Sequence, residues 1–258
     1  YGDGACYLAS VENIAGGKFR MRVTRELDVP FAAEVRAALG GELPGGEWTA
    51  FRSRTTVANA GNNTWSRATG LPCIWIVGMF LPGDEAWAIA PFRKDGADPD
   101  GGPAVRSDYF GAVPDDRFRM GSNFALFRAD AAEVGKIGVL RDRAVNRIAS
   151  WNPETRIFTL ITFSPLDRNA PYLSEHWGTE LPDPYYGDVV NSYNHGGPET
   201  FFELESSSPA LALAPGAAHT HGCLTVHARL EDDAALARVL RSALDVSPEE
   251  FAALSAGR

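Results

Sequence analysis

Residues 201–227 read FFELESSSPALALAPGAAHTHGCLTVH. Apolar and polar residues alternate at both ends of this stretch, and proline and glycine lie between the two alternating parts. Alternation with a period of two, bounded by turn residues, predicts β-strands. The stretch also contains two glutamates and three of the chain's five histidines, more ionisable groups than a core requires. It therefore predicts sheet structure and a functional site together.

The same alternation recurs along the whole chain and predicts an all-β fold built of antiparallel sheet. The expected strands are FRMRVTREL (19–27), WTAFRSRTTVAN (48–59), CIWIVGMF (73–80), EAWAIAPF (85–92), NFALFRA (123–129), NRIASW (146–151), IFTLITFS (157–164), FFELESS (201–207) and LTVHARL (224–230). WNPETR (151–156) predicts a hairpin, because Asn152 and Pro153 supply turn chemistry.

The C-terminal segment has the pattern of helices. DDAALARVLRSAL (232–244) begins with acidic residues and repeats apolar residues at helical spacing. In SPEEFAAL (247–254), Ser247, Pro248 and Glu250 form a capping-box pattern. We expect one β-sandwich domain over residues 1–258, with a helical tail at 232–258.

Composition excludes several partners. The 258 residues include 24 Lys and Arg against 33 Asp and Glu, a formal charge of -9, and no basic run. Such a chain repels nucleic acid. The longest apolar run, around Trp75, is shorter than the roughly 20 residues that span a bilayer. Cys6, Cys73 and Cys223 are far apart and are expected to be small buried side chains.

The chain begins at Tyr1 without an initiator methionine, a charged segment or an apolar signal segment. Either a preceding segment was removed or it is not included in this sequence. We expect an extracytoplasmic protein, periplasmic or secreted.

Glu203 and Glu205 are candidate catalytic residues. On a strand they share one face, about 7 Å apart, while Phe202 and Leu204 face the core. Neighbouring carboxylates repel each other unless a cation, a donor or a shared proton separates them. The alternative is a solvated outer face.

His219, His221 and His227 share one parity along their strand. Such histidines serve as acids and bases near neutral pH, or bind a divalent metal when a carboxylate completes the set. His219, His221 and Glu203 (or Glu205) form the candidate metal set. Gly222 is a candidate bulge that would shift the register. The alternative is a structural role for each histidine.

YYGDVVNSYNHGG (185–197) combines hydrogen-bonding groups and an aromatic ring that suit sugar hydroxyls and the C–H face of a sugar ring. The alternative is an Asx-rich turn. The candidate substrate-binding residues are Trp65, Trp75, Tyr109, Asp188, Asn191, Tyr193, His195 and His227, with Trp177 as a further aromatic platform. The loop at 92–111 is expected to border a binding site.

Motifs of other enzyme classes are missing from the sequence. It contains no Gly-rich phosphate loop, no G-x-S-x-G elbow and no H-E-x-x-H helix. Nucleotide hydrolysis, α/β-hydrolase chemistry and ordinary zinc proteolysis lose support accordingly.

The succession TTVANAGNNTW, GLPCIWIVGMF, GDVVNSYN, FFELESSSPALALAPG and HTH resembles a family of uncharacterised bacterial proteins with the galactose-mutarotase-like β-supersandwich, the fold of aldose 1-epimerases. The resemblance covers about residues 18–230. It implies a concave sheet face that binds carbohydrate. Members of this fold are usually longer at the N-terminus, so early strands are missing here or supplied elsewhere. The catalytic His and Glu of the epimerases do not align residue by residue, so the resemblance does not imply their reaction.

The leading hypothesis is a carbohydrate-active enzyme, a hydrolase, lyase or epimerase, in which Glu203 or Glu205 and His219 or His221 exchange protons with a glycan or sugar derivative. One alternative is a non-catalytic carbohydrate-binding or accessory domain. Another is a metal-dependent His-x-His site, although the glutamate expected after a cupin-like pair is replaced by GCLTVH. No cofactor other than a divalent metal is indicated.

Overall fold

Two antiparallel sheets and three short helices form the described part of the chain. The computed structural model describes residues 2–41, 47–95, 102–176, 183–198 and 200–257. The larger sheet consists, in spatial order, of β1 (Gly2–Glu12), β2 (Lys18–Asp28), β3 (Trp48–Asn59), β14 (Ala218–Arg229), β11 (Ile157–Phe163), β10 (Arg147–Asn152), β5 (Trp87–Pro91), β8 (Phe124–Arg128) and β7 (Phe118–Met120). The smaller sheet consists of β4 (Trp75–Phe80), β13 (Phe202–Ser207), β12 (Asp188–Asn194), β9 (Gly135–Leu140) and β6 (Val105–Arg106).

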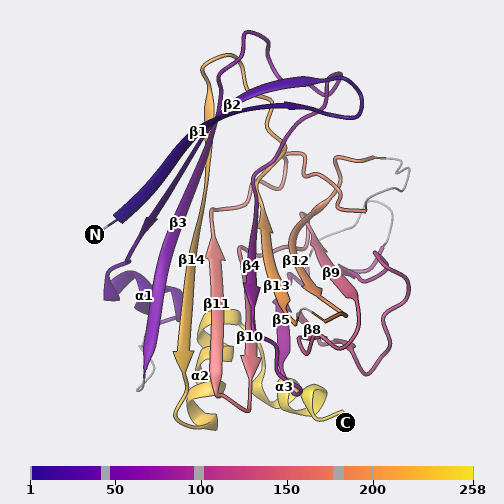
Figure 1. Cartoon of the computed structure of the whole chain (residues 1–258). Coiled ribbons are helices and arrows are strands. Elements are labelled where there is room, and N and C mark those ends of the chain that lie inside the picture. The colour runs from indigo at the N-terminus through magenta and orange to yellow at the C-terminus, as the bar shows by residue number, and fades with distance from the viewer. Residues whose placement is uncertain (1, 42–46, 96–101, 177–182, 199, 258) are drawn as a thin grey trace.

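The sheets and helices stack in three layers. The smaller sheet packs against one face of the larger sheet through an apolar core. Helices α1 (Ala32–Ala38), α2 (Asp233–Leu244) and α3 (Pro248–Ser255) contribute to a second core on the opposite face. Figure 1 shows the smaller sheet in front of one half of the larger sheet, with β1 and β2 extending beyond it. The predicted all-β antiparallel sandwich with C-terminal helices is confirmed.

Central strands of the larger sheet are apolar on both faces because both faces are covered. In β5, Trp87 and Ile89 pack in the core shared with the helices, whereas Ala88 and Ala90 pack toward the smaller sheet. The small alanine side chains leave room for the second sheet to approach. Burial on both sides explains the nearly continuous apolar run of this strand.

The tail helices begin at capping residues, as predicted. The side chain of Asp232 accepts a hydrogen bond from the backbone N–H of Ala235 at 2.8 Å. Ser247 accepts one from the backbone N–H of Glu250 at 3.2 Å. These bonds satisfy amide groups that lack partners within the helices. Helix α1, of seven residues, was not predicted from the sequence. Among the described residues, no helix is long and apolar enough to cross a membrane.

Cysteine burial differs from the expectation. Cys223 is buried and Cys73 is partly buried, but Cys6 is exposed. The reason is its position on β1, an edge strand that lies outside both cores.

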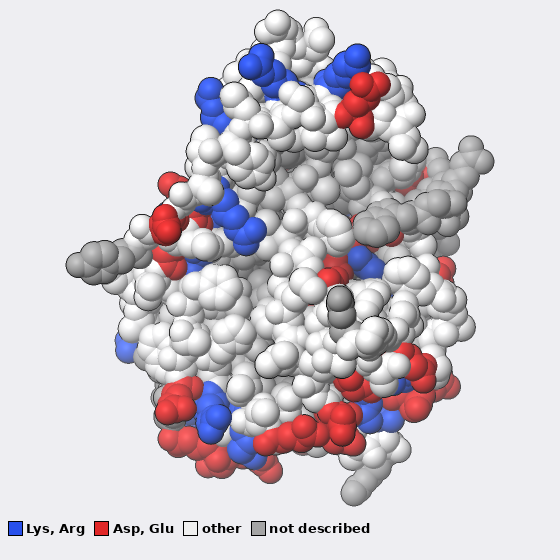
Figure 2. Space-filling view, in the orientation of Figure 1, with Lys and Arg blue, Asp and Glu red and all other residues white. Residues whose placement is uncertain are grey.

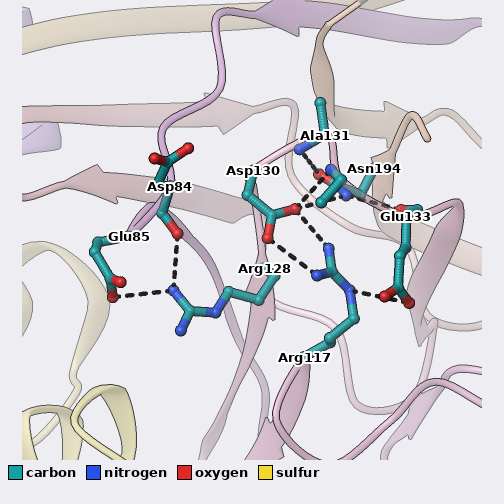
Figure 3. Close-up of polar contacts among 9 residues, drawn as sticks. Asp84, Glu85, Arg117, Arg128, Asp130, Ala131, Glu133 and Asn194 are labelled. Carbon is teal, nitrogen blue, oxygen red and sulfur yellow. Dashed lines mark hydrogen bonds and ion pairs between the residues drawn. The ribbon is translucent and has the colours of Figure 1, made fainter. Parts of the chain in front are cut away.

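A buried ion pair anchors the turn between β8 and β9 (Figure 3). Asp130 accepts two hydrogen bonds from the Arg117 guanidinium, one of 3.0 Å and one of 2.5 Å. It also accepts one from Asn194 at 3.1 Å, at the end of β12. Each side chain of the Arg117–Asp130 pair is only 11% exposed. Removing one partner would therefore leave a largely desolvated charge behind.

We expect Asp130→Asn to lower the free energy of unfolding by about 2–4 kcal/mol at neutral pH. Burial raises the pKa of Asp130, but the bonds from Arg117 and the Ala132 amide outweigh it, so the pKa is lowered. A lowered carboxyl pKa gives stability that is present above the unfolded pKa and lost as pH falls through the folded pKa. Urea unfolding at neutral and acidic pH measures both effects.

The matched control is Glu85→Gln. Glu85 pairs with Arg128, but its side chain is 63% exposed, so we expect a change within about 0.5 kcal/mol. Equal losses in the two variants would contradict the anchoring role of Asp130.

Candidate functional site

The two faces of β13 have different surroundings. Phe202 and Leu204 belong to the core between the sheets. Glu203 and Glu205 therefore lie on the outer face of the smaller sheet, because successive strand residues point to opposite faces. The predicted shared face of the two glutamates is thus present in the structure. Glu205 is nevertheless buried, and only 1% of it is exposed.

Neighbouring strands bring further polar side chains to this face. In the register of β12 and β13, Asn191 lies opposite Glu205 and Tyr193 lies opposite Glu203. On β9, Lys136 lies opposite Tyr193. Strand pairing alone thus places an amide, a phenol and an amine beside the two carboxyls.

Lys136 holds the centre of the cluster. Its Nζ donates to Glu205 Oε2 at 3.0 Å and Oε1 at 3.3 Å. It also donates to Glu175 Oε2, from the loop after residue 170. The indole N–H of Trp75, on β4, donates to Glu205 Oε2 at 2.8 Å. Ser207 donates to the other oxygen of Glu175 at 3.3 Å.

A cavity of about 240 Å³ opens beside this cluster. Its lining residues are Trp75, Phe110, Lys136, Glu175, Tyr193 and Glu203. The volume lies just below the roughly 300–1,000 Å³ typical of sites for drug-sized ligands, so it suits one small ring. Figure 2 shows a face whose middle is mostly uncharged, with a basic side chain lying beside acidic ones within it.

Burial and crowding change the proton affinities of the cluster. Burial raises the pKa of Glu175 to about 7, and the neighbouring Glu205 also raises it. Burial likewise raises the pKa of Glu203 and of Glu205. For Lys136, burial acts to lower the pKa, but the attraction of Glu205 and Glu175 outweighs it and the pKa is raised. The Lys136 ammonium therefore stays charged, whereas the carboxyl groups hold their protons more tightly than usual.

A second polar group lies beneath Tyr109. Its hydroxyl donates to Asp188 Oδ2, and Asn191 Nδ2 approaches the same hydroxyl at 3.5 Å. Burial raises the pKa of Asp188. Gly138 makes this arrangement possible, because a Cβ there would lie 2.0 Å from the Tyr109 hydroxyl and 2.8 Å from the Asp188 Cγ. A side chain at position 138 would therefore displace Tyr109 or Asp188.

His176 completes the outer rim. Its ring stacks on Tyr109 with centroids 4.1 Å apart, and its Nε2 lies 3.1 Å from Asp108 Oδ1. The stacking fixes Tyr109 over Asp188. The loop at 92–111, which was expected to border a binding site, supplies Phe110 to the cavity lining and Tyr109 beside His176; its residues 96–101 lie outside the described residues.

The histidines of β14 do not join this site, contrary to the expectation. His221 Nε2 lies 3.0 Å from the Ser206 hydroxyl, on the inner face of β13, whereas Glu205 points outward. Pairing with β3 is continuous through Gly222, so the suspected bulge is absent and His219 shares the inward face. Burial, with a contribution from His219, lowers the pKa of His221 to about 4.

The metal set proposed from His219, His221 and Glu203 is not assembled, because the smaller sheet separates its members. Over the described ranges, no group of three or more His, Cys, Asp or Glu side chains is arranged to hold a metal ion. His227 lies on the inner side as well, with Nδ1 3.0 Å from the Thr159 hydroxyl and its ring against Phe80.

The predicted sugar-binding residues divide into two groups. Those that the structure gathers around the cavity and its floor are Trp75, Tyr109, Asp188, Asn191 and Tyr193. His195 lies next to them, with Nδ1 3.1 Å from the Tyr193 hydroxyl and its ring stacked on Phe201. Trp65 is elsewhere, 3% exposed in an apolar cluster with Phe19, so it is not an accessible platform. Trp177 lies outside the described residues.

Four residues of the site were not predicted from the sequence: Lys136, Glu175, Phe110 and His176. GKIGVL (135–140) is a short run flanked by glycine, and its lysine resembles any surface lysine. The signal available in the sequence was the alternation of Lys136 with the apolar residues Ile137 and Val139. In the structure both apolar residues are buried, and Lys136 is 6% exposed. Glu175 comes from a loop without periodicity and gave no signal.

The chain is similar to known proteins in two respects: its sequence matches a protein family, and its architecture is similar to that of solved structures. The family described as "Family of unknown function (DUF6786)" matches residues 7–254. No curated protein matches the chain significantly.

Two solved structures are similar in architecture. The Slr1438 protein from Synechocystis sp. PCC 6803 has 11% identity and a TM-score of 0.46 over 88% of this chain. A protein from Escherichia coli K12 described as a "putative aldose 1-epimerase" has 11% identity and a TM-score of 0.48, also over 88%. The chain spans 62% and 66% of their respective lengths, less than two thirds of either.

Proposed function

The chain belongs to the DUF6786 family of unknown function, and we propose that it is a carbohydrate-active enzyme in which Glu175 and Glu203 exchange protons with a sugar ring. We assign to these two carboxyls the acid–base role that was expected of the β14 histidines, because the carboxyls line the cavity and the histidines do not.

The observation that carries the proposal is the environment of Glu175. This carboxyl borders the cavity, and burial raises its pKa to about 7. A carboxyl that remains protonated near neutral pH can serve as a general acid. Glu203 is less buried than Glu175, and the charge of Lys136 and a hydrogen bond with Glu205 oppose the rise in its pKa that burial causes, so it serves as the base. Two carboxyls in different surroundings divide the acid and base roles.

The remaining residues position these two. Glu205 is buried and receives hydrogen bonds from Lys136 and Trp75, so it fixes the ammonium beside Glu175. Trp75, Phe110 and Tyr193 present aromatic surface that packs against the C–H side of a sugar ring. The charged groups then bond to its hydroxyls, each of which donates and accepts.

A panel of aldoses and oligosaccharides tests the proposal. Anomer exchange is followed by NMR, bond cleavage by released reducing ends, and elimination by ultraviolet absorbance. On a substrate that the parent protein converts, we expect Glu203→Gln to lower kcat/KM by at least about 100-fold. The control Glu154→Gln, on the exposed turn between β10 and β11, should retain full activity.

A protein that binds sugars without converting any of them would instead be a carbohydrate-binding domain. Full activity of Glu203→Gln would remove Glu203 from the mechanism.

A further inference from the structure

A second cavity, of about 320 Å³, lies between the two sheets. Leu204 of β13 lines it and belongs to the core between the sheets, whereas the preceding residue, Glu203, lines the first cavity. Successive strand residues point to opposite faces, so the two cavities lie on opposite sides of the smaller sheet. Protein interiors leave few voids larger than a water molecule, and this volume falls within the range of ligand sites. The cavity is therefore a candidate for a second binding site.

The wall of this cavity is mostly apolar. The larger apolar side chains come from both sheets: Phe51, Ile76, Met79, Phe80, Ile161 and Leu204. Phe51 is 42% exposed and Met79 is 59% exposed, and β4 is an edge strand of the smaller sheet, so the cavity opens to solvent at this edge. An apolar wall with an open mouth suits a ligand that has a hydrocarbon body.

A guanidinium group lies at the cavity. Arg25 of β2 is exposed and belongs to the lining, and within the described ranges it makes no ion pair or side-chain hydrogen bond. Burial raises the pKa of the Cys223 thiol, another lining group, and the charge of Arg25 is among the effects that oppose this rise. The positive charge of Arg25 therefore acts on the interior of the cavity as well as on its mouth.

Hydroxyl groups without partners accompany Arg25. Ser53 is 2% exposed and Thr225 is 4% exposed; both line the cavity, and neither makes a side-chain hydrogen bond to a described residue. Thr55 lies directly opposite Arg25 in the pairing of β2 with β3, and its buried Oγ1 also lacks a partner there. Buried polar groups normally have partners. A guanidinium only donates and hydroxyls can donate, so the group that matches them is an acceptor with negative charge.

We propose that this cavity binds an apolar carboxylic acid, with the carboxylate at Arg25 and the hydrocarbon part between the sheets against Leu204 and Ile161. The corresponding alcohol would fill the same space without the charge that Arg25 attracts. The corresponding amine would be repelled by Arg25. This site goes beyond the proposed function, because it shares no lining residue with the cavity beside Glu175.

Calorimetric titration at low salt and about pH 8 tests the proposal with two matched series. The alkyl series is decanoate, decanol and decylamine, and the aromatic series is naphthoate, naphthalenemethanol and naphthalenemethylamine. In at least one series we expect the carboxylate to bind about fivefold more tightly than the alcohol, the contribution of a partly solvated ion pair, and the amine to bind most weakly. The formal charge of the chain is -9, so non-specific binding would favour the amine instead.

Arg25→Met should lower the affinity for the carboxylate to that for the alcohol and leave the alcohol's affinity unchanged. The matched control is Arg22→Met, because Arg22 is an exposed arginine of the same strand on its opposite face, and it should retain the preference. Thr225→Ile adds apolar bulk to the cavity and should weaken binding of the carboxylate and the alcohol alike.

Three results would overturn the inference: equal affinity for carboxylate and alcohol in both series, a preference for the amine, or a carboxylate preference that survives in Arg25→Met. Unchanged binding in Thr225→Ile would place the ligand outside the cavity and overturn it as well. Absence of binding by every compound would do the same. None of these results bears on sugar conversion at Glu175 and Glu203, which is measured separately.

Discussion

Glu175→Gln is expected to lower kcat by about 10²–10⁴-fold, the usual contribution of a positioned general acid. The amide keeps the size of the side chain and its contact with Ser207, but it cannot supply a proton. Sugar binding should change far less than kcat. Steady-state kinetics and calorimetry on the same substrate separate the two quantities.

The dependence of activity on pH tests whether Glu175 is the group that supplies the proton. The pKa of Glu175 is raised to about 7, so its acid form is present below this pH and is lost above it. We expect the activity of the parent protein to fall as pH rises through about 7, and Glu175→Gln to lack this limb. Glu154→Gln should keep it. If the limb persists in Glu175→Gln, another group supplies the proton.

Lys136→Met is expected to lower the free energy of unfolding by about 3–5 kcal/mol above neutral pH. Methionine replaces the alkyl stem of the lysine, but Glu175 and Glu205 then share a buried site without their cation. The penalty arises from the remaining carboxylates rather than from lost packing. Chemical unfolding measured at several pH values checks the prediction.

The direction in which the stability loss of Lys136→Met changes with pH distinguishes an effect of charge from an effect of packing. Without Lys136, the two carboxyls avoid the penalty by taking up protons, so the loss should shrink toward about pH 5 and grow toward about pH 8. The control is Lys18→Met, since the Lys18 side chain is 78% exposed and its partner Glu12 is exposed as well. It should change stability little at either pH. A loss in Lys136→Met that does not vary with pH would contradict the role of its charge.

Several site residues could be identified from sequence because their position on a strand is a local property. Glu203 and Glu205 alternate with Phe202 and Leu204, and this spacing alone directs them away from the core. The polar cluster at 185–197 was also identified, although its strand, β12, was not. DVVNSYN mixes apolar and polar residues without strict alternation, and a bulge between Asp188 and Val190 interrupts its pairing with β9.

The partners of these residues could not be found in the same way. Lys136 reaches Glu205 across 69 positions of sequence, and Glu175 reaches Lys136 across 39. Neither contact has a local pattern, because it depends on which strands pair and on which loop folds over them. A lysine in a short strand and a glutamate in a loop acquire their special proton affinities only when the folded chain buries them together.

The amino-acid sequence by itself determined the strands with strong alternation, the capped tail helices and the parity of each polar side chain, since all of these depend on neighbours within a few residues. Only the tertiary structure decided which polar faces meet. β13 and β14 are consecutive along the chain, but β13 joins the smaller sheet and β14 the larger one. His221 of β14 therefore faces the inner side of β13, whereas Glu205 of β13 faces outward to Lys136. Parity fixes the direction of a side chain relative to its own strand, whereas the pairing of distant strands fixes what lies in that direction.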